Sequence, residues 1–351
     1  MKRRKTNPIH VGNVQVGGGA PIAVQSMCNT DTRDVAATVA QIHRMEQAGC
    51  DITRVAVVDQ QAARAIYEIK QQVNIPIVAD IHFDYRLALE CVAAGVDKIR
   101  INPGNIGGDD HVKAVADACR THNIPIRIGV NGGSLEKEIL AKYGRPCPEA
   151  LVESALYHVS LLEKFDFDQI AISIKSSNVQ DMIDGYRLLS SETFYPLHLG
   201  VTEAGTYHMG LLKSAIGIGS LLCDGIGDTL RVSLTDDPVL EIGAGLDILK
   251  ACGLREDGIR FVSCPTCGRC SIDLISLAKR AETELADIRK PVKVAIMGCV
   301  VNGPGEAREA DIGIAGGGGE GILFKKGEIL RRVPYDEILA ALREEIEKLD
   351  V

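Results

Sequence analysis

Four cysteines near the C-terminus are the residues best placed to bind a metal in this chain of 351 residues. Cys264, Cys267 and Cys270 form a C-x2-C-x2-C run, and Cys299 follows in the stretch MGCVVNGPGE. Thiolates at this spacing can converge on one metal centre, as they do in iron–sulfur and zinc sites alike. A zinc site would have to be all-cysteine or include a carboxylate, because no histidine follows His208. The spacing favours iron–sulfur but leaves zinc open.

Glu306 lies seven residues after Cys299, across a turn rich in Gly and Pro. A carboxylate binds iron more weakly than a thiolate does, so a substrate oxygen could displace it. An iron with such an exchangeable position can act as a Lewis acid as well as pass electrons. From the residues alone, however, a solvated loop acid is the simpler interpretation of Glu306.

A second set of candidate functional residues consists of arginines that recur in the predicted strands. In each strand the Arg and the residue two positions later share one face, while apolar residues take the other. In a closed barrel the apolar face must contact the helices, so the arginines point inward. Together with Lys175 they outnumber the three candidate inward acids, Asp80, Glu203 and Asp228. The strand arginines are Arg54, Arg100, Arg127 and Arg231.

This positive charge predicts a multiply charged anionic ligand, because an uncompensated buried charge costs several kcal/mol. A diphosphate would suit it, since the guanidinium fork matches phosphate oxygens. Asn131, four residues after Arg127, lies on the same face and could add a hydrogen bond. His82 ends the third strand, where barrel active sites are built, and is a candidate proton carrier or supporting residue. A structural role is the alternative for a single histidine.

The elements that must position these residues alternate regularly along the chain. Eight β-rich runs alternate with amphipathic helical segments up to about residue 240, which predicts a (β/α)8 TIM barrel. Gly49 and Gly95 fit helix C-caps immediately before strands. A smaller α/β domain follows, and its run of four glycines (316–319) is interpreted as a surface loop. We predict a substrate-binding barrel over residues 1–250 and a metal-cluster domain over residues 255–351.

Composition excludes several classes of protein. Hydrophobic residues make up 46%, charged residues 25%, and the net charge is −8, so a general binder of nucleic acid or acidic membrane is not expected. No apolar run approaches the ~20 residues of a membrane span, and no apolar segment follows the basic N-terminus. A cytoplasmic location is the default expectation.

Several stretches together resemble the family of bacterial 4-hydroxy-3-methylbut-2-enyl diphosphate synthases, iron–sulfur enzymes of the non-mevalonate isoprenoid pathway. The resemblance runs from about residue 8 to about residue 340 and corresponds to the two-domain bacterial form. The matching stretches are PIAVQSMCNTDT, VADIHFD, KIRINPGNIG, IRIGVNGGSL, VTEAG, GIGDTLRVSLT, SCPTCGR and MGCVVNGPGE.

The resemblance implies a 4Fe-4S cluster held by Cys264, Cys267, Cys299 and Glu306, rather than by Cys270. It implies an oxidoreductase that opens the ring of 2-C-methyl-D-erythritol 2,4-cyclodiphosphate by two-electron reduction with loss of water. Glu203 is then our choice of proton donor. The residues that would hold or surround the cyclic diphosphate are Arg54, Asp80, His82, Arg100, Arg127, Asn131, Lys175, Arg231 and Ser263.

The resemblance also implies partners. The family enzymes are homodimers in which one subunit's cluster domain caps the other's barrel. Electrons are expected from a flavodoxin or ferredoxin, because the chain carries no flavin or nicotinamide motif. Two other interpretations remain: a pterin-type barrel transferase with a structural zinc domain, and an iron–sulfur carrier. The carrier would leave the inward arginines without a purpose.

Overall fold

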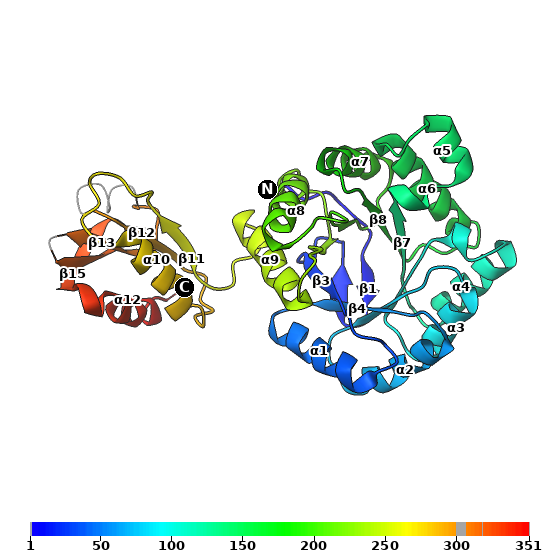
Figure 1. Cartoon of the computed structure of the whole chain (residues 1–351), viewed down its shortest axis with the longest axis horizontal. Coiled ribbons are helices and arrows are strands. Elements are labelled where there is room, and N and C mark those ends of the chain that lie inside the picture. The colour runs from blue at the N-terminus through cyan, green and yellow to red at the C-terminus, as the bar shows by residue number, and fades with distance from the viewer. Residues whose placement is uncertain (1, 300–306, 318, 351) are drawn as a thin grey trace. The chain divides into compact units, whose positions relative to one another are not determined.

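The computed structural model describes residues 2–299, 307–317 and 319–350, apart from the side chain of residue 134. The chain divides into two compact units, Met1–Leu254 and Arg255–Val351 (Figure 1). Each unit has its own hydrophobic core.

The first unit contains eight parallel strands in a nearly closed barrel, which confirms the predicted TIM-barrel fold. Their order is β8-β7-β6-β5-β4-β3-β10-β9, and a parallel bridge between Ile172 and Leu197 joins β8 to the residue before β9. The strands are β3 (Ala23–Met27), β4 (Ile52–Ala56), β5 (Ile77–Asp80), β6 (Lys98–Ile101), β7 (Ile126–Asn131), β8 (Ile170–Lys175), β9 (His198–Leu199) and β10 (Thr229–Leu230).

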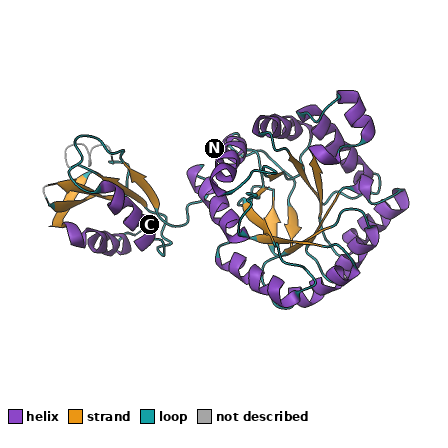
Figure 2. Ribbon diagram, viewed as in Figure 1, coloured by secondary structure: helices purple, strands orange, loops and turns teal. Residues whose placement is uncertain are grey.

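Helices surround this ring of strands, as Figure 2 shows. They are α1 (Val35–Gln47), α2 (Gln60–Lys70), α3 (Tyr85–Ala93), α4 (Asp109–Thr121), α6 (Pro148–Glu163), α7 (Val179–Glu192), α8 (Tyr207–Cys223) and α9 (Pro238–Ala251). Two short 3-10 turns, η1 (Pro103–Asn105) and η2 (Gly132–Ser134), and a short helix, α5 (Lys137–Tyr143), lie in the loops after β6 and β7. Gly49 and Gly95 have φ angles of 92° and 83°, as helix-ending glycines require.

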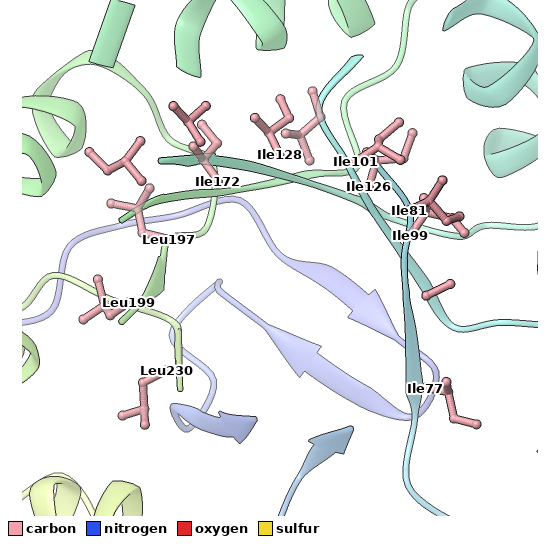
Figure 3. Packing of buried hydrophobic residues seen from close by; sticks show 14 of the residues in the cluster. Ile77, Ile81, Ile99, Ile101, Ile126, Ile128, Ile172, Leu197, Leu199 and Leu230 are labelled. Carbon is pink, nitrogen blue, oxygen red and sulfur yellow. The ribbon is translucent and has the colours of Figure 1, made fainter. Parts of the chain in front are cut away.

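Strand alternation builds the barrel core. Apolar side chains on the outer face of the strands, such as Ile99, Ile126 and Ile128, are fully buried and point toward the helices (Figure 3). Each buried aliphatic side chain contributes about 1.5–3 kcal/mol of transfer free energy. The outer face of the strands therefore packs against the helices, and the inner face can carry polar residues.

A hairpin at the N-terminus packs against the end of the barrel where the strands begin. It consists of β1 (Ile9–Val11) and β2 (Val14–Val16), which pair antiparallel. Ile9, Val11 and Val16 pack against residues near the amino ends of the barrel strands, among them Ile52 and Val78. The sequence analysis does not predict this hairpin, because strands of three residues give too short a periodic signal.

The second unit is one sheet with helices on one face. The strand order is β11-β12-β13-β14-β15, in which the first two pairings are parallel and the last two antiparallel. Helices α10 and α12 share a core with one face of this sheet. The elements are β11 (Arg260–Ser263), α10 (Leu274–Glu284), β12 (Lys293–Met297), β13 (Ile312–Gly317), β14 (Glu320–Lys325), β15 (Glu328–Pro334), η3 (Tyr335–Glu337) and α12 (Ile338–Glu347).

The glycine run is a correction to the predicted surface loop, because Gly316 and Gly317 end strand β13. A Cβ atom at Gly316 would lie 2.3 Å from Ile272 Cγ2, and one at Gly321 would lie 2.1 Å from Ile338 Cδ1. Glycine is therefore required here for close packing rather than for flexibility.

Candidate active site

A polar cavity of about 200 Å³ opens at the carboxyl ends of the barrel strands. This is the end where βα loops build the active sites of such barrels. Residues from β4 to β8, and from the segments after β9 and β10, contribute to its walls. The lining residues are Arg54, Asp80, His82, Arg100, Arg127, Gly129, Val130, Asn131, Ser173, Lys175, Thr202, Arg231 and Ser233.

The four strand arginines all reach this cavity, so their predicted inward orientation is confirmed. The parallel register explains why they meet: Arg100 lies opposite both Asp80 of β5 and Arg127 of β7. Arg127 is only 1% exposed. Small residues next to the arginines make room for them, since a Cβ atom at Gly129 would lie 2.4 Å from Arg100 Nε.

Asp80 compensates part of the positive charge. Its carboxylate accepts a hydrogen bond from Arg100 Nη1 at 3.0 Å and lies 3.7 Å from Arg54 Nε. Burial raises the pKa of the Asp80 carboxyl, but the surrounding arginines outweigh burial and hold that pKa at about 2. Asp80 is therefore ionised at neutral pH. It organises the arginines and is a poor proton donor.

Glu241 compensates Arg231, and the sequence analysis missed it. Its two carboxylate oxygens accept hydrogen bonds from Arg231 Nε and Nη2, each at 3.0 Å. Glu241 is 2% exposed and also accepts from Ser26 Oγ at 2.7 Å and from the Leu234 backbone at 3.0 Å. It lies in the first turn of α9, outside the strands. The stretch PVLEIGAG is apolar except for this glutamate, which indicates that the acid is buried. Because buried acids are nearly always paired, it could have been predicted to contact a basic residue.

Positive charge still exceeds negative charge at this cavity. Three arginine nitrogens, Arg127 Nε and Nη2 and Arg100 Nε, are buried without a hydrogen-bond partner in the described structure. Burial, reinforced by neighbouring arginines, lowers the pKa of both Lys175 and Arg127 well below their ordinary values. The arrangement requires an anion, since buried donors and charges without partners are costly.

The remaining predicted residues divide into two groups. His82 and Asn131 line the cavity, whereas Glu203 does not; it is exposed in the loop after β9, next to Thr202, which does. Asp228 was also expected to face inward near the arginines. This expectation is wrong, because Asp228 accepts hydrogen bonds from Thr6 Oγ1 and the Leu197 backbone, away from the cavity.

Ser263, predicted to contact substrate, is exposed at the end of β11 in the second unit, and its predicted role stays a prediction. The serines and threonine that line the barrel cavity are Ser173, Thr202 and Ser233. Ser233 lies two residues after Arg231, and strand alternation had already placed the two on one face.

The predicted cluster ligands lie in the second unit. β11 and β12 are neighbouring parallel strands, so Cys264 follows one strand end and Cys299 lies two residues beyond the other. The Gly298 backbone N–H donates to Cys264 Sγ at 3.3 Å. Cys267 is exposed, whereas Cys270 Sγ is engaged with Ile272 O at 3.3 Å. Glu306 lies outside the described residues.

This donor set fits an iron–sulfur cluster in its chemistry. Thiolates are the usual ligands of such clusters, and N–H donation to sulfur tunes them. Across the described parts of both units, no three potential ligands are already gathered as a metal site. Among the described helices, none combines the length and apolarity needed to cross a membrane.

Comparison with protein families matches both units. Residues 6–246 match the model described as the GcpE TIM-barrel domain, and residues 260–348 match the GcpE protein C-terminal domain. A Clostridium perfringens protein is 60% identical over 349 residues, which cover 99% of this chain and 100% of that protein. A Geobacter sulfurreducens protein is 59% identical over 347 residues, which cover 99% and 98%. Both are named 4-hydroxy-3-methylbut-2-en-1-yl diphosphate synthase (flavodoxin).

Solved structures of other proteins resemble the barrel more distantly. A type I 3-dehydroquinate dehydratase from Clostridium difficile gives a TM-score of 0.52 at 13% identity, covering 70% of this chain and 97% of its own. A 7,8-dihydropteroate synthase from Vibrio fischeri gives 0.51 at 16% identity, with the same coverage. These similarities show the barrel fold alone.

Proposed function

The chain belongs to the GcpE family, and on that premise we propose that it converts 2-C-methyl-D-erythritol 2,4-cyclodiphosphate to 4-hydroxy-3-methylbut-2-enyl diphosphate. The reaction is a two-electron reductive ring opening with loss of water. The observation that carries the proposal is the uncompensated positive charge of the barrel cavity. A pterin-type transferase has no support from the family match.

The cavity residues bind the cyclic diphosphate. Arg127 and Arg100 donate to phosphate oxygens through nitrogens that otherwise lack partners, and Lys175 adds a point charge. Asn131 and Ser233, which also line the cavity, supply uncharged hydrogen-bonding groups. Because the Asp80 and Glu241 carboxylates fix the arginines before substrate arrives, little reorganisation is needed on binding.

Glu203 is our candidate proton donor for the oxygen that leaves as water. It adopts a left-handed backbone conformation with φ of 52°, which is uncommon for a residue other than glycine. Such conformations concentrate at functional sites, where the surroundings hold them in place. Its neighbour Thr202 lines the cavity, so the same loop connects Glu203 to the binding site. His82 is the second candidate for proton transfer.

The second unit holds a 4Fe-4S cluster through Cys264, Cys267, Cys299 and Glu306. When bound, the cluster supplies electrons one at a time and a Lewis-acidic iron. The Gly298 N–H stabilises the Cys264 thiolate, and Cys270 stays outside the proposed ligand set, as the family resemblance implies.

We infer that flavodoxin delivers the electrons, as the names of the relatives indicate, with ferredoxin as the alternative donor. We also propose a homodimer in which the cluster-bearing unit of one subunit covers the barrel of its partner. Two observations support a covered surface. Val58 and Phe83, which follow β4 and β5, are 68% and 73% exposed, and Met209, Leu212 and Ile216 form an exposed apolar stripe on α8.

The cluster is tested by measuring iron, acid-labile sulfide and zinc in protein purified without oxygen. We expect about four iron and four sulfide per chain, with broad absorption near 400 nm. One zinc and no sulfide, unchanged after cluster reconstitution is attempted, would contradict the proposal.

A further inference from the structure

His158, which lies outside the substrate cavity, connects three segments near the mouth of the barrel. It belongs to α6 and its side chain is fully buried. The Gly104 backbone N–H, in the loop after β6, donates to His158 Nδ1 at 3.1 Å. His158 Nε2 lies 2.7 Å from Glu136 Oε1, in the loop after β7. One imidazole ring thus joins both loops to a rigid helix.

The contacts of the ring fix its protonation. Because Nδ1 accepts a hydrogen bond from a backbone N–H, the ring proton is on Nε2, the nitrogen that lies 2.7 Å from Glu136 Oε1. Burial lowers the pKa of His158, although Glu136 acts in the opposite direction. The ring is therefore neutral at neutral pH; its Nδ1 accepts from Gly104, and its Nε2 lies in close polar contact with Glu136 without forming a hydrogen bond in this structure.

Gly104 allows this close approach. A Cβ atom at Gly104 would lie 2.8 Å from His158 Cε1, a distance that side chains do not tolerate. The absence of a side chain lets the ring sit directly against the backbone of the loop. The histidine and the glycine are therefore complementary in shape as well as in hydrogen bonding.

Both connected loops continue from strands that bind the proposed substrate. At the end of β6, Asn102 Oδ1 accepts a hydrogen bond from Gly129 N at 2.9 Å, and Arg100 donates to Gly129 O at 2.7 Å. At the end of β7, Asn131 lines the cavity five residues before Glu136, and its Oδ1 accepts from Gly133 N at 3.1 Å. A shift of either loop would displace these cavity groups.

We propose that Gly104, Glu136 and His158 form a loop clamp, in which Glu136 and His158 are positioning residues that hold the diphosphate-binding wall of β6 and β7. The proposal rests on the proposed function for its ligand, but the clamp itself is defined by contacts within the first unit. Loss of the clamp weakens substrate binding more than it slows the chemical steps, because neither residue lines the cavity.

Two substitutions separate the hydrogen bond to Gly104 from the contact with Glu136. His158→Asn keeps an acceptor near the position of Nδ1 for Gly104 but cannot reach Glu136. His158→Gln presents an amide N–H near the position of Nε2 for Glu136 but leaves Gly104 without its acceptor. Glu136→Gln keeps an oxygen beside Nε2 at similar side-chain size and is the conservative variant. His43→Asn is the matched control, because His43 forms an exposed pair with Glu46 on α1.

Hydrogen exchange of the full chain, followed by mass spectrometry, is the readout that does not depend on activity. We expect His158→Asn to raise exchange in peptides covering residues 131–140, and His158→Gln to raise it in peptides covering residues 102–106. Glu136→Gln and His43→Asn should leave both regions close to wild type. Unchanged exchange in both His158 variants would overturn the clamp.

Steady-state kinetics of the cluster-loaded enzyme then test the positioning role. We expect KM for the cyclic diphosphate to rise about tenfold in His158→Asn, because a displaced cavity group would lose about one hydrogen bond to the substrate, with kcat within about a factor of two. Equal loss of kcat and kcat/KM with KM unchanged would overturn positioning. A wild-type enzyme without turnover would contradict the proposed function instead, and the exchange result would still decide the clamp.

Discussion

Glu241 provides the sharpest quantitative prediction, because its carboxylate is buried and both of its oxygens accept hydrogen bonds. It accepts four hydrogen bonds, two from Arg231 and one each from Ser26 and the Leu234 backbone. Glu241→Gln preserves the size of the side chain but removes its charge. The amide nitrogen must then face a donor that the carboxylate oxygen had accepted from, and Arg231 loses its counter-charge.

The expected cost follows from burial. Breaking a buried ion pair by removing one partner costs about 3–5 kcal/mol. The Arg231 side chain is 16% exposed and keeps some hydration, so we expect the lower end, about 3 kcal/mol. For a domain of this size, about 3 kcal/mol corresponds to a fall in Tm of roughly 6–12 °C.

Differential scanning calorimetry of the full chain is the assay, with Glu90→Gln as the matched control. Glu90 pairs with Arg64 at 2.7 Å between α2 and α3, but the Arg64 side chain is 70% exposed. Such a pair contributes about 0–1 kcal/mol, so its Tm change should be small. The double variant Arg231→Met with Glu241→Leu should recover stability without recovering substrate binding. A Glu241→Gln shift no larger than that of Glu90→Gln would refute the reasoning.

Three further predictions concern the cavity and the cluster. Arg127→Met should leave Tm unchanged or raised, because it removes a buried charge that is only partly compensated. The same variant should weaken binding of the cyclic diphosphate by about 1.5–3 kcal/mol in calorimetric titration. A strong loss of stability would contradict this prediction. The fold lowers the pKa of Asp80 from 3.8 to about 2, so the ionised carboxylate stabilises the fold above about pH 4, and this stabilisation is lost as pH falls toward 2. In Asp80→Asn, the free energy of unfolding should therefore fall less between pH 4 and pH 2 than in wild type. Identical acid-unfolding profiles would refute this. Cys270→Ser should retain iron and sulfide whereas Cys267→Ser should lose them, and the reverse result in metal analysis would make Cys270 the ligand.

The barrel was predictable because its signals are local. Period-2 alternation placed each strand arginine and the outer isoleucines on opposite faces, and the structure confirms both faces. Gly49 and Gly95 marked helix ends because their backbone conformation favours glycine. The hairpin of β1 and β2 was not predictable in this way, since its strands are short and its partners lie far along the chain.

The charge balance of the cavity was only half predictable. Asp80 follows from strand alternation, whereas Glu241 reaches Arg231 from a helix, and no strand pattern can indicate that contact. Asp228 directly precedes β10 and Arg231 directly follows it, so closeness in sequence did not bring the two side chains to the same site.

The most direct test of the account is turnover of 2-C-methyl-D-erythritol 2,4-cyclodiphosphate by the full chain, purified and cluster-loaded without oxygen, with reduced flavodoxin as the electron donor. We predict formation of 4-hydroxy-3-methylbut-2-enyl diphosphate, two electrons consumed per product, and no product when flavodoxin is omitted. A fully cluster-loaded chain that binds the cyclic diphosphate but returns it unchanged, with reduced flavodoxin or ferredoxin present, would contradict the proposed function.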